Sequence, residues 1–134
     1  MINCLFFAIG FVLFFTFSFG GMAFSSIHRS FQNIDRSVLE VSVVTIDESG
    51  DDTRPYFNEE VLEEYVSNYL LDNIGKYSTN YQSKILYFDT ETRQINTNHH
   101  ANGVRISIST KINMFYTYQK SREFTIDERG KINE

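Results

Sequence analysis

The side chains that most often carry out chemistry in proteins are scarce in this chain of 134 residues, which has three histidines and one cysteine. His99 and His100 are adjacent, and neighbours on an extended chain point to opposite sides, so they are poorly placed to share a metal ion. His28 follows the apolar N-terminal segment, where an amphipathic ring suits lipid headgroups. The single Cys4 excludes an internal disulfide, and acylation of its thiol is the alternative to a small apolar residue. We therefore expect no metal and no cofactor.

The sequence also lacks the residue patterns that acid–base or nucleophilic catalysis requires. Glu59, Glu60, Glu63 and Glu64 form carboxylate pairs at helical spacing, but they fall on the face predicted to be wet, where nothing raises a pKa for acid–base work. The sequence has no nucleophile elbow and no glycine-rich phosphate loop. The acidic loop 47–56 lacks the glycine and glutamate that an EF-hand needs at positions six and twelve. The sequence thus predicts a protein that is not an enzyme and has no catalytic residues.

The charge distribution bears on the possible partners. A net charge of −5 argues against nucleic-acid binding, which needs a basic face. The many tyrosines could stack on bases or sugars, but without a basic groove they are better explained by core and interface packing. None of the 12 Lys+Arg or 17 Asp+Glu side chains precedes His28, so the chain divides sharply into an uncharged and a charged part.

The uncharged part, residues 1–27, is predicted to be a transmembrane anchor. Residues 5–24 form an apolar run that carries no charge. About 20 helical residues cross a hydrocarbon core of roughly 30 Å, and in lipid only a helix satisfies the backbone of a single span. A cleaved secretory signal is the alternative, with a passable cleavage site at Ala23-Phe24-Ser25. However, no Lys or Arg precedes the run, and the run is longer than a signal needs.

Orientation follows less directly from the residues. Arg29 and Arg36 follow the span and only the α-amino group precedes it, which mildly favours a cytoplasmic C-terminal part. Translocated domains of this length often disregard so weak a bias, and the short tail before the run is easily left inside the cell. We expect a single-pass protein of the cell membrane with its C-terminal domain outside the cytoplasm.

An amphipathic stripe follows the span. Phe31, Ile34, Val38 and Val41 are spaced by three, four and three residues, the step of one helix face. This spacing predicts that residues 28–40 continue the anchor helix. The narrow apolar stripe needs a partner surface, either the sheet of its own domain or a neighbouring subunit. These four residues are the predicted interaction face, and the expected partners are the membrane and other membrane-anchored subunits or further copies of the chain.

Residues 28–134 are predicted to form one small α+β domain. Asn58 is a suitable N-cap for a helix that ends near Ile74, with Gly75 as a left-handed C-cap. The alternation of β-branched and polar residues is clearest from Val104 onward. Strands are expected at residues 84–89, 93–97, 104–112 and 115–126, the last broken near residues 120–123. The predicted fold is thus a transmembrane helix continuing into an amphipathic helix, then a second helix and an antiparallel sheet of three or four strands, with two helices on one side.

This layout resembles the pilin-like proteins of bacteria, in particular the small minor pseudopilins of tight-adherence pili. The resemblance is one of architecture: an apolar helix with an amphipathic second half (Phe31, Ile34, Val38 and Val41) and a small α+β head. Type IV pilins also carry a glutamate five residues into the mature helix. Counted from the junction Gly10-Phe11, that place holds Phe15, a departure that bears on filament assembly and not on anchorage.

The resemblance implies a non-catalytic, single-pass membrane-anchored subunit of a bacterial surface pilus or secretion assembly. An independent membrane-anchored extracytoplasmic binding module is the second hypothesis, in which the sheet and its aromatic side chains hold a ligand. A signal-cleaved secreted protein is the third, and it differs only in the fate of the apolar segment.

Overall fold

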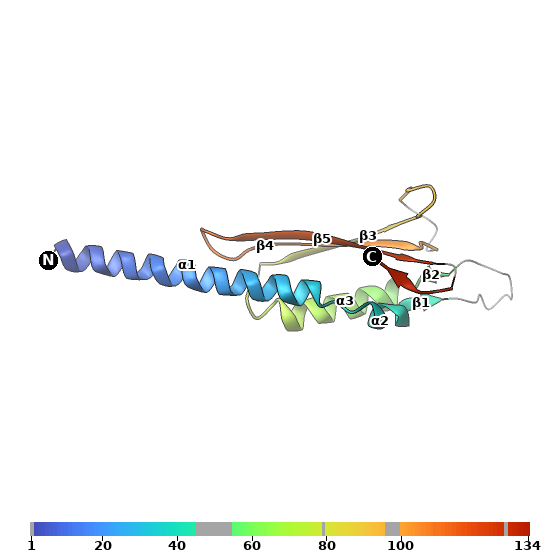
Figure 1. Cartoon of the computed structure of the whole chain (residues 1–134), viewed down its shortest axis with the longest axis horizontal. Coiled ribbons are helices and arrows are strands. Elements are labelled where there is room, and N and C mark those ends of the chain that lie inside the picture. Colours follow the sequence, from blue (N-terminus) through green and yellow to red (C-terminus); the bar gives the residue numbers. More distant parts are fainter. Residues whose placement is uncertain (1, 45–54, 79, 96–99, 128) are drawn as a thin grey trace.

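The chain forms a long N-terminal helix whose second half joins a head built on an antiparallel sheet (Figure 1). The computed structural model describes residues 2–44, 55–78, 80–95, 100–127 and 129–134. Within these ranges the helices are α1 (Ile2–Gln32), α2 (Arg36–Leu39) and α3 (Glu59–Asn73), with a 3-10 turn at Glu40–Ser42. The strands are β1 (Val43–Val44), β2 (Tyr56–Phe57), β3 (Gln82–Phe88), β4 (Gly103–Lys111), β5 (Thr117–Ile126) and β6 (Ile132–Asn133). The predicted α+β fold class is confirmed.

Strands β3, β4, β5 and β6 form one antiparallel sheet in chain order, and β1 and β2 pair separately. Ile106 in β4 lies opposite Ile85 of β3 and Arg122 of β5. The alternation predicted for this strand is confirmed, since Val104, Ile106 and Ile108 are buried whereas Arg105 between them is exposed. This register places an apolar face toward the helices.

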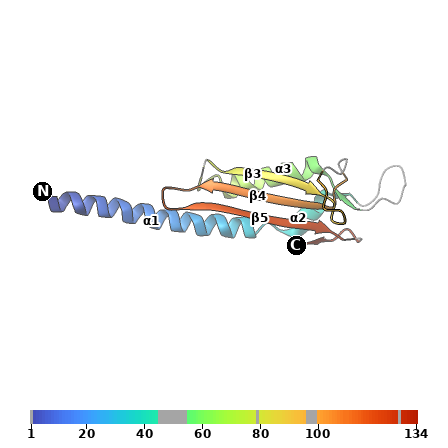
Figure 2. The ribbon, with the colours of Figure 1, turned by 90° about the horizontal axis from the view of Figure 1, so that it is seen from above.

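The second half of α1 and helix α3 cover the same face of the sheet, as the two perpendicular views show (Figures 1 and 2). Ala23, Ile27 and Phe31 follow at four-residue steps on α1 and are buried. Ile27 and Phe31 share one hydrophobic core with Leu62 and Leu70 of α3 and with the inward residues of β4 and β5. The predicted placement of two helices on one side of the sheet is therefore confirmed.

Helix α3 begins and ends where the sequence predicts, but its C-terminal cap differs. The Asn58 side chain accepts a hydrogen bond from the backbone N–H of Val61 at 3.3 Å, which satisfies one of the free donors of the first turn. The left-handed C-cap predicted at Gly75 is wrong, because among the described glycines only Gly130 has a positive φ. A Cβ on Gly75 would lie 2.5 Å from the carbonyl oxygen of Leu71, so close approach of the backbone explains the glycine.

The prediction that the anchor helix continues through residue 40 is wrong. Helix α1 ends at Gln32, and the short α2 follows after a turn. The Nη1 group of Arg122, from β5, donates hydrogen bonds to the carbonyl oxygens of Phe31 at 2.9 Å, Gln32 at 3.2 Å and Ile34 at 3.4 Å. Carbonyls at a helix end have no partner within the helix, so a cation placed there stabilises the end.

The predicted break of the last strand near residues 120–123 is also wrong, since β5 runs without interruption from Thr117 to Ile126. The charges that suggested a break instead alternate between the faces of the sheet. Glu123 points to the outer face, where it pairs with Arg105. Arg122 points inward and is 8% exposed. Its Nε and Nη2 groups bind the two carboxylate oxygens of Glu134 at 2.7 and 2.6 Å, a paired and hydrogen-bonded state that a buried charge requires.

We predict that Arg122→Met lowers the free energy of unfolding by about 3 kcal/mol, because the helix-end carbonyls lose a charged donor and Glu134 loses its partner. The matched control is Arg105→Met in the neighbouring strand, whose ion pair with Glu123 is exposed to solvent and contributes less than about 1 kcal/mol. Urea unfolding of both variants in detergent, followed by circular dichroism, measures the difference. An equal decrease in the free energy of unfolding for both variants would show that the buried position of Arg122 does not make its ion pair more stabilising.

The same ion pair predicts how stability depends on pH. The hydrogen bonds from Arg122 hold the pKa of Glu134 below its usual value of 4.5. A carboxyl whose pKa is depressed by folding stabilises the folded state above its unfolded pKa, and this contribution disappears as the pH falls through its folded pKa. We expect Glu134→Gln to be less stable than the unsubstituted protein at pH 7. The two proteins should converge below pH 4.5, as measured by urea unfolding at each pH, whereas a constant difference down to pH 3 would contradict the linkage.

Candidate functional site: the exposed half of the N-terminal helix

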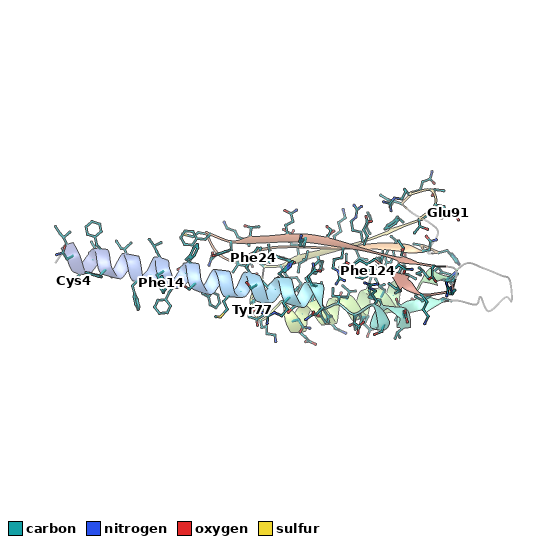
Figure 3. The ribbon with its side chains drawn as sticks, viewed as in Figure 1. Cys4, Phe14, Phe24, Tyr77, Glu91 and Phe124 are labelled. Atoms are coloured by element: carbon teal, nitrogen blue, oxygen red, sulfur yellow. The ribbon has the colours of Figure 1, made fainter. Side chains whose placement is uncertain are left out.

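The first 18 residues of α1, residues 2–19, project beyond the head and none of them is buried. Large apolar side chains are exposed on all sides of this half, for example Phe7 at 80% and Phe14 at 66%. Figure 3 shows Cys4 and Phe14 projecting with no strand beside them, whereas Phe24 lies next to the sheet. An all-round apolar helix left bare in water is unfavourable, so this half needs an apolar surrounding.

By length and composition α1 can cross a membrane, and it is the one candidate span within the described residues. Its most apolar window is not buried at all, which distinguishes it from the core helix of a soluble protein. A signal sequence near an N-terminus has the same properties. The predicted membrane association is therefore supported at the level of an apolar, exposed helix, and the retention of the anchor stays a prediction.

The boundary between the two halves of α1 is formed by small residues. Gly20 and Gly21 lie under the ring of Tyr116, from the turn that joins β4 and β5. A Cβ on Gly20 would approach the Nδ2 atom of Asn113 to 2.5 Å. The same Nδ2 donates a hydrogen bond to the carbonyl oxygen of Thr16 at 2.9 Å. The glycines thus permit the turn to touch the helix backbone.

The predicted interaction face is only partly available to a partner. Phe31 is fully buried and Ile34 is 3% exposed, both in the core of the head. Val41 is 76% exposed and lies in the 3-10 turn, and the side chain of Val38 is outside the described part of the structure. Of the two partner surfaces considered from the sequence, the sheet of the chain's own domain therefore covers Phe31 and Ile34. Helix α1 ends at Gln32, between Phe31 and Ile34, so the four residues do not share one helix face.

His28 and His100 occupy ordinary structural positions. The His28 ring contacts Tyr118, with Nδ1 3.0 Å from the phenol oxygen, and burial raises the pKa of Tyr118 to about 12. His100 packs against the ring of Tyr56, at 4.3 Å between centroids. His99 and most of the acidic loop 47–56 lie outside the described residues. Within the described ranges no group of three His, Cys, Asp or Glu side chains is arranged to hold a metal ion.

The predicted glutamate pairs lie on α3. Tyr87 donates a hydrogen bond at 3.3 Å to the Oε1 atom of Glu63 and another at 3.3 Å to the backbone carbonyl of Glu59. Burial raises the pKa of the Tyr87 phenol, and the two nearby glutamates add to that shift. This contact docks α3 on the edge strand β3. It supplies no acid–base pair, because a phenol held neutral does not take a proton from a carboxylate.

A hollow of about 290 Å³ lies on the outer face of the sheet. Phe88 and Leu86 form its floor, and Arg93 lies over the Phe88 ring at 5.2 Å. Arg105 and Glu123 line it as well, and they pair with each other. The basic groups are already engaged by the glutamate, so the hollow offers a small polar and apolar surface with little net charge.

The residue that sequence reasoning missed is Arg122. Side chains alternate between the two faces of β5, and Arg122 lies on the inward face together with Tyr118, Phe124 and Ile126, which are all buried. The two-residue alternation of a strand places this arginine on the apolar face. The other charged residues near it in the sequence make that alternation hard to recognise.

No protein-family model, no curated protein and no solved structure matches the chain. What can be said of its function therefore rests on its own residues and geometry.

The small-residue boundary on α1 gives a stability prediction. We expect Gly20→Leu to lower the free energy of unfolding by about 1–3 kcal/mol, because the added side chain overlaps Tyr116 and Asn113. Gly10→Leu is the matched control, since a Cβ there has no neighbour within 4 Å, and it should leave the unfolding of the head unchanged. Urea unfolding in detergent compares the two. A Gly20→Leu protein as stable as the control would mean that the turn does not rest on the helix.

Proposed function

We propose that this protein is a non-catalytic, single-pass membrane-anchored subunit of a surface or secretion assembly of the pilin-like kind, with its head outside the cytoplasm. The observation that carries the proposal is the division of α1 into two halves. Residues 2–19 are largely apolar and none of them is buried, whereas Gly20, Ala23, Ile27 and Phe31 are buried on the side that faces the head. One helix that is both a span and a part of the head holds the head at a fixed distance and angle from the lipid.

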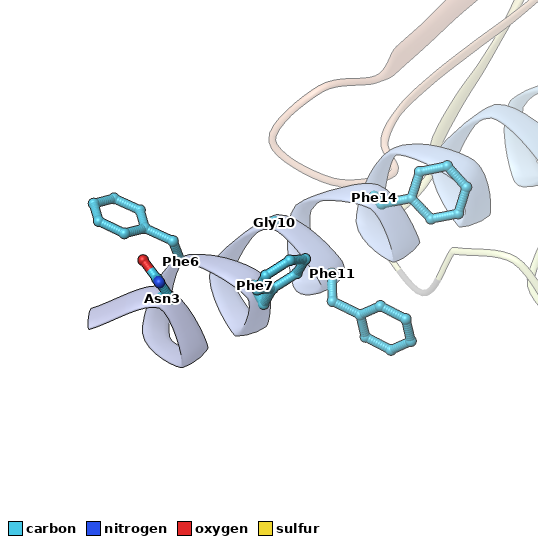
Figure 4. Close-up of a pocket in the computed structure, with 6 residues that line it drawn as sticks. All are labelled: Asn3, Phe6, Phe7, Gly10, Phe11 and Phe14. Atoms are coloured by element: carbon cyan, nitrogen blue, oxygen red, sulfur yellow. The ribbon is translucent and has the colours of Figure 1, made fainter. Parts of the chain in front are cut away.

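The bare half has a shape suited to another helix. Asn3, Phe6, Phe7, Gly10, Phe11 and Phe14 surround a shallow hollow of about 440 Å³ (Figure 4). Gly10 forms its floor, where nothing of the chain lies within 4 Å of an added Cβ. Small residues let helix backbones approach closely in lipid, and polar side chains such as Asn3 can bond across the interface. The hollow therefore supports packing against a second span.

The surfaces of the head that are available to other subunits differ from the interaction face predicted from the sequence. Phe31 and Ile34, two of the four residues of the predicted interaction face, are buried in the core, so a charge placed on either would unfold the head. Contacts between subunits must use other surfaces, and the bare half of α1 is the largest apolar one among the described residues. The second hypothesis, an anchored binding module, draws its support from the hollow on the outer face of the sheet.

The test replaces the floor of the hollow in the full-length protein. Gly10→Leu should weaken association with other spans severalfold, because the larger side chain prevents close approach. Ala8→Leu is the matched control, since residues two apart lie on opposite sides of a helix. The measurement is cross-linking and co-purification of neighbours from native membranes. Unchanged association in both variants contradicts the assembly proposal, and retained function with a wholly different span would favour the binding module.

A further inference from the structure

The turn that joins β4 and β5, residues 112–116, reaches farther along α1 toward its N-terminus than any other part of the head (Figure 1). We call this turn the β4–β5 tip. Its Phe115 ring lies 6.0 Å from that of Phe17, and its Tyr116 ring lies 5.5 Å from the same residue. The tip is thus in contact with α1 at the end of the bare half.

The place of contact lies inside the uncharged run 5–24. The tip touches α1 from Thr16 to Gly21. Thr16 is eight residues before Phe24, which corresponds to about 12 Å along a helix. A bilayer that contains the run therefore surrounds the stretch of helix against which the tip is packed.

The composition of the tip suits a lipid surrounding. None of its five residues is charged. Met114 is 73% exposed and Phe115 is 46% exposed, and both would be poorly placed in water. Since moving apolar surface from water into hydrocarbon lowers the free energy, insertion of these two residues is favourable.

Several polar groups of the tip are hydrogen-bonded within the protein. The Oδ1 atom of Asn113 accepts hydrogen bonds from the backbone N–H groups of Phe115 at 2.9 Å and Tyr116 at 3.2 Å. The backbone N–H of Ile112 bonds to the carbonyl oxygen of Tyr116 at 3.0 Å. Because lipid offers no hydrogen-bond partners, each bond made within the turn lowers the cost of placing it beside the acyl chains.

Exposed Lys111 marks the base of the tip. The long side chain of a lysine can keep its ammonium group among lipid headgroups while the neighbouring apolar residues lie deeper. The order along the chain, a cation followed by an uncharged apolar turn, is therefore the order expected at a bilayer surface.

We propose that the β4–β5 tip is a second membrane-contacting element, which inserts Met114 and Phe115 into the acyl region beside α1. The proposal rests on the membrane anchorage proposed above. The occupant of this surface is lipid and not a further protein chain, because the exposed side of the tip continues the apolar surface of the bare half of α1. With two points of contact the head is held against rotation about the helix axis and sits low on the bilayer.

The test uses the absence of tryptophan from the chain. Three full-length single-tryptophan variants are reconstituted in phosphatidylcholine vesicles: Phe115→Trp in the tip, Phe11→Trp in the bare half of α1, and Ile95→Trp at the opposite end of the sheet, where Ile95 is 61% exposed. Each is measured in ordinary lipid and in lipid brominated near the glycerol end of its acyl chains, which quenches tryptophan on contact. Unchanged circular dichroism confirms that each variant is folded.

The expected result is that Phe115→Trp and Phe11→Trp lose most of their emission in brominated lipid, whereas Ile95→Trp keeps it. If Phe11→Trp is quenched and Phe115→Trp is not, the anchor stands and the tip proposal is overturned. Emission from Phe115→Trp that is blue-shifted but unquenched means that protein covers the tip, which also overturns it. If Phe11→Trp is unquenched, the proposed anchorage itself fails. Equal quenching of Ile95→Trp means that the whole head lies on lipid, and the tip has no special role.

Discussion

The guanidinium group of Arg122, in β5, joins the end of α1 to Glu134 beyond β6. It binds the carbonyl oxygens at the end of α1, the carboxylate of Glu134, and the ring of Phe124, over which it lies at 4.8 Å. A buried cation without these partners would cost several kcal/mol. The arrangement therefore holds only if helix, sheet and C-terminal strand are all in place, and it determines where α1 stops.

The end of α1 in turn determines what the helix can do. One face of the helix, with Gly20, Ala23, Ile27 and Phe31, is committed to the head, and the bare half is left available for contact with other molecules. The glycines at the boundary let the β4–β5 turn lie directly on the helix. The head is thus rigidly attached to its helix, without a flexible linker between Phe24 and Phe31.

Much of the fold could be predicted from local patterns. The cap at Asn58, the alternation from Val104 to Ile108 and the apolar run near the N-terminus each depend on neighbouring residues alone, and each is found in the structure. Two of the errors have a common cause. The helix beyond Gln32 and the unbroken β5 both depend on Arg122, whose partners come from elsewhere in the chain, and local patterning treated that arginine as one of a group of surface charges. Gly75 was assigned a left-handed turn where backbone crowding at Leu71 explains it.

Composition and short-range periodicity are enough to show that the first 27 residues are uncharged, that a small α+β head follows, and that the familiar sequence motifs of catalysis and metal binding are missing. These properties do not depend on how the chain folds back on itself. Three features depend on the fold: Phe31 and Ile34 belong to the head's own core, half of α1 is left without a covering surface, and the β4–β5 tip lies beside Thr16. Contacts between residues some 90 positions apart, such as Asn113 with Thr16 and Arg122 with Phe31, leave no periodic trace in sequence.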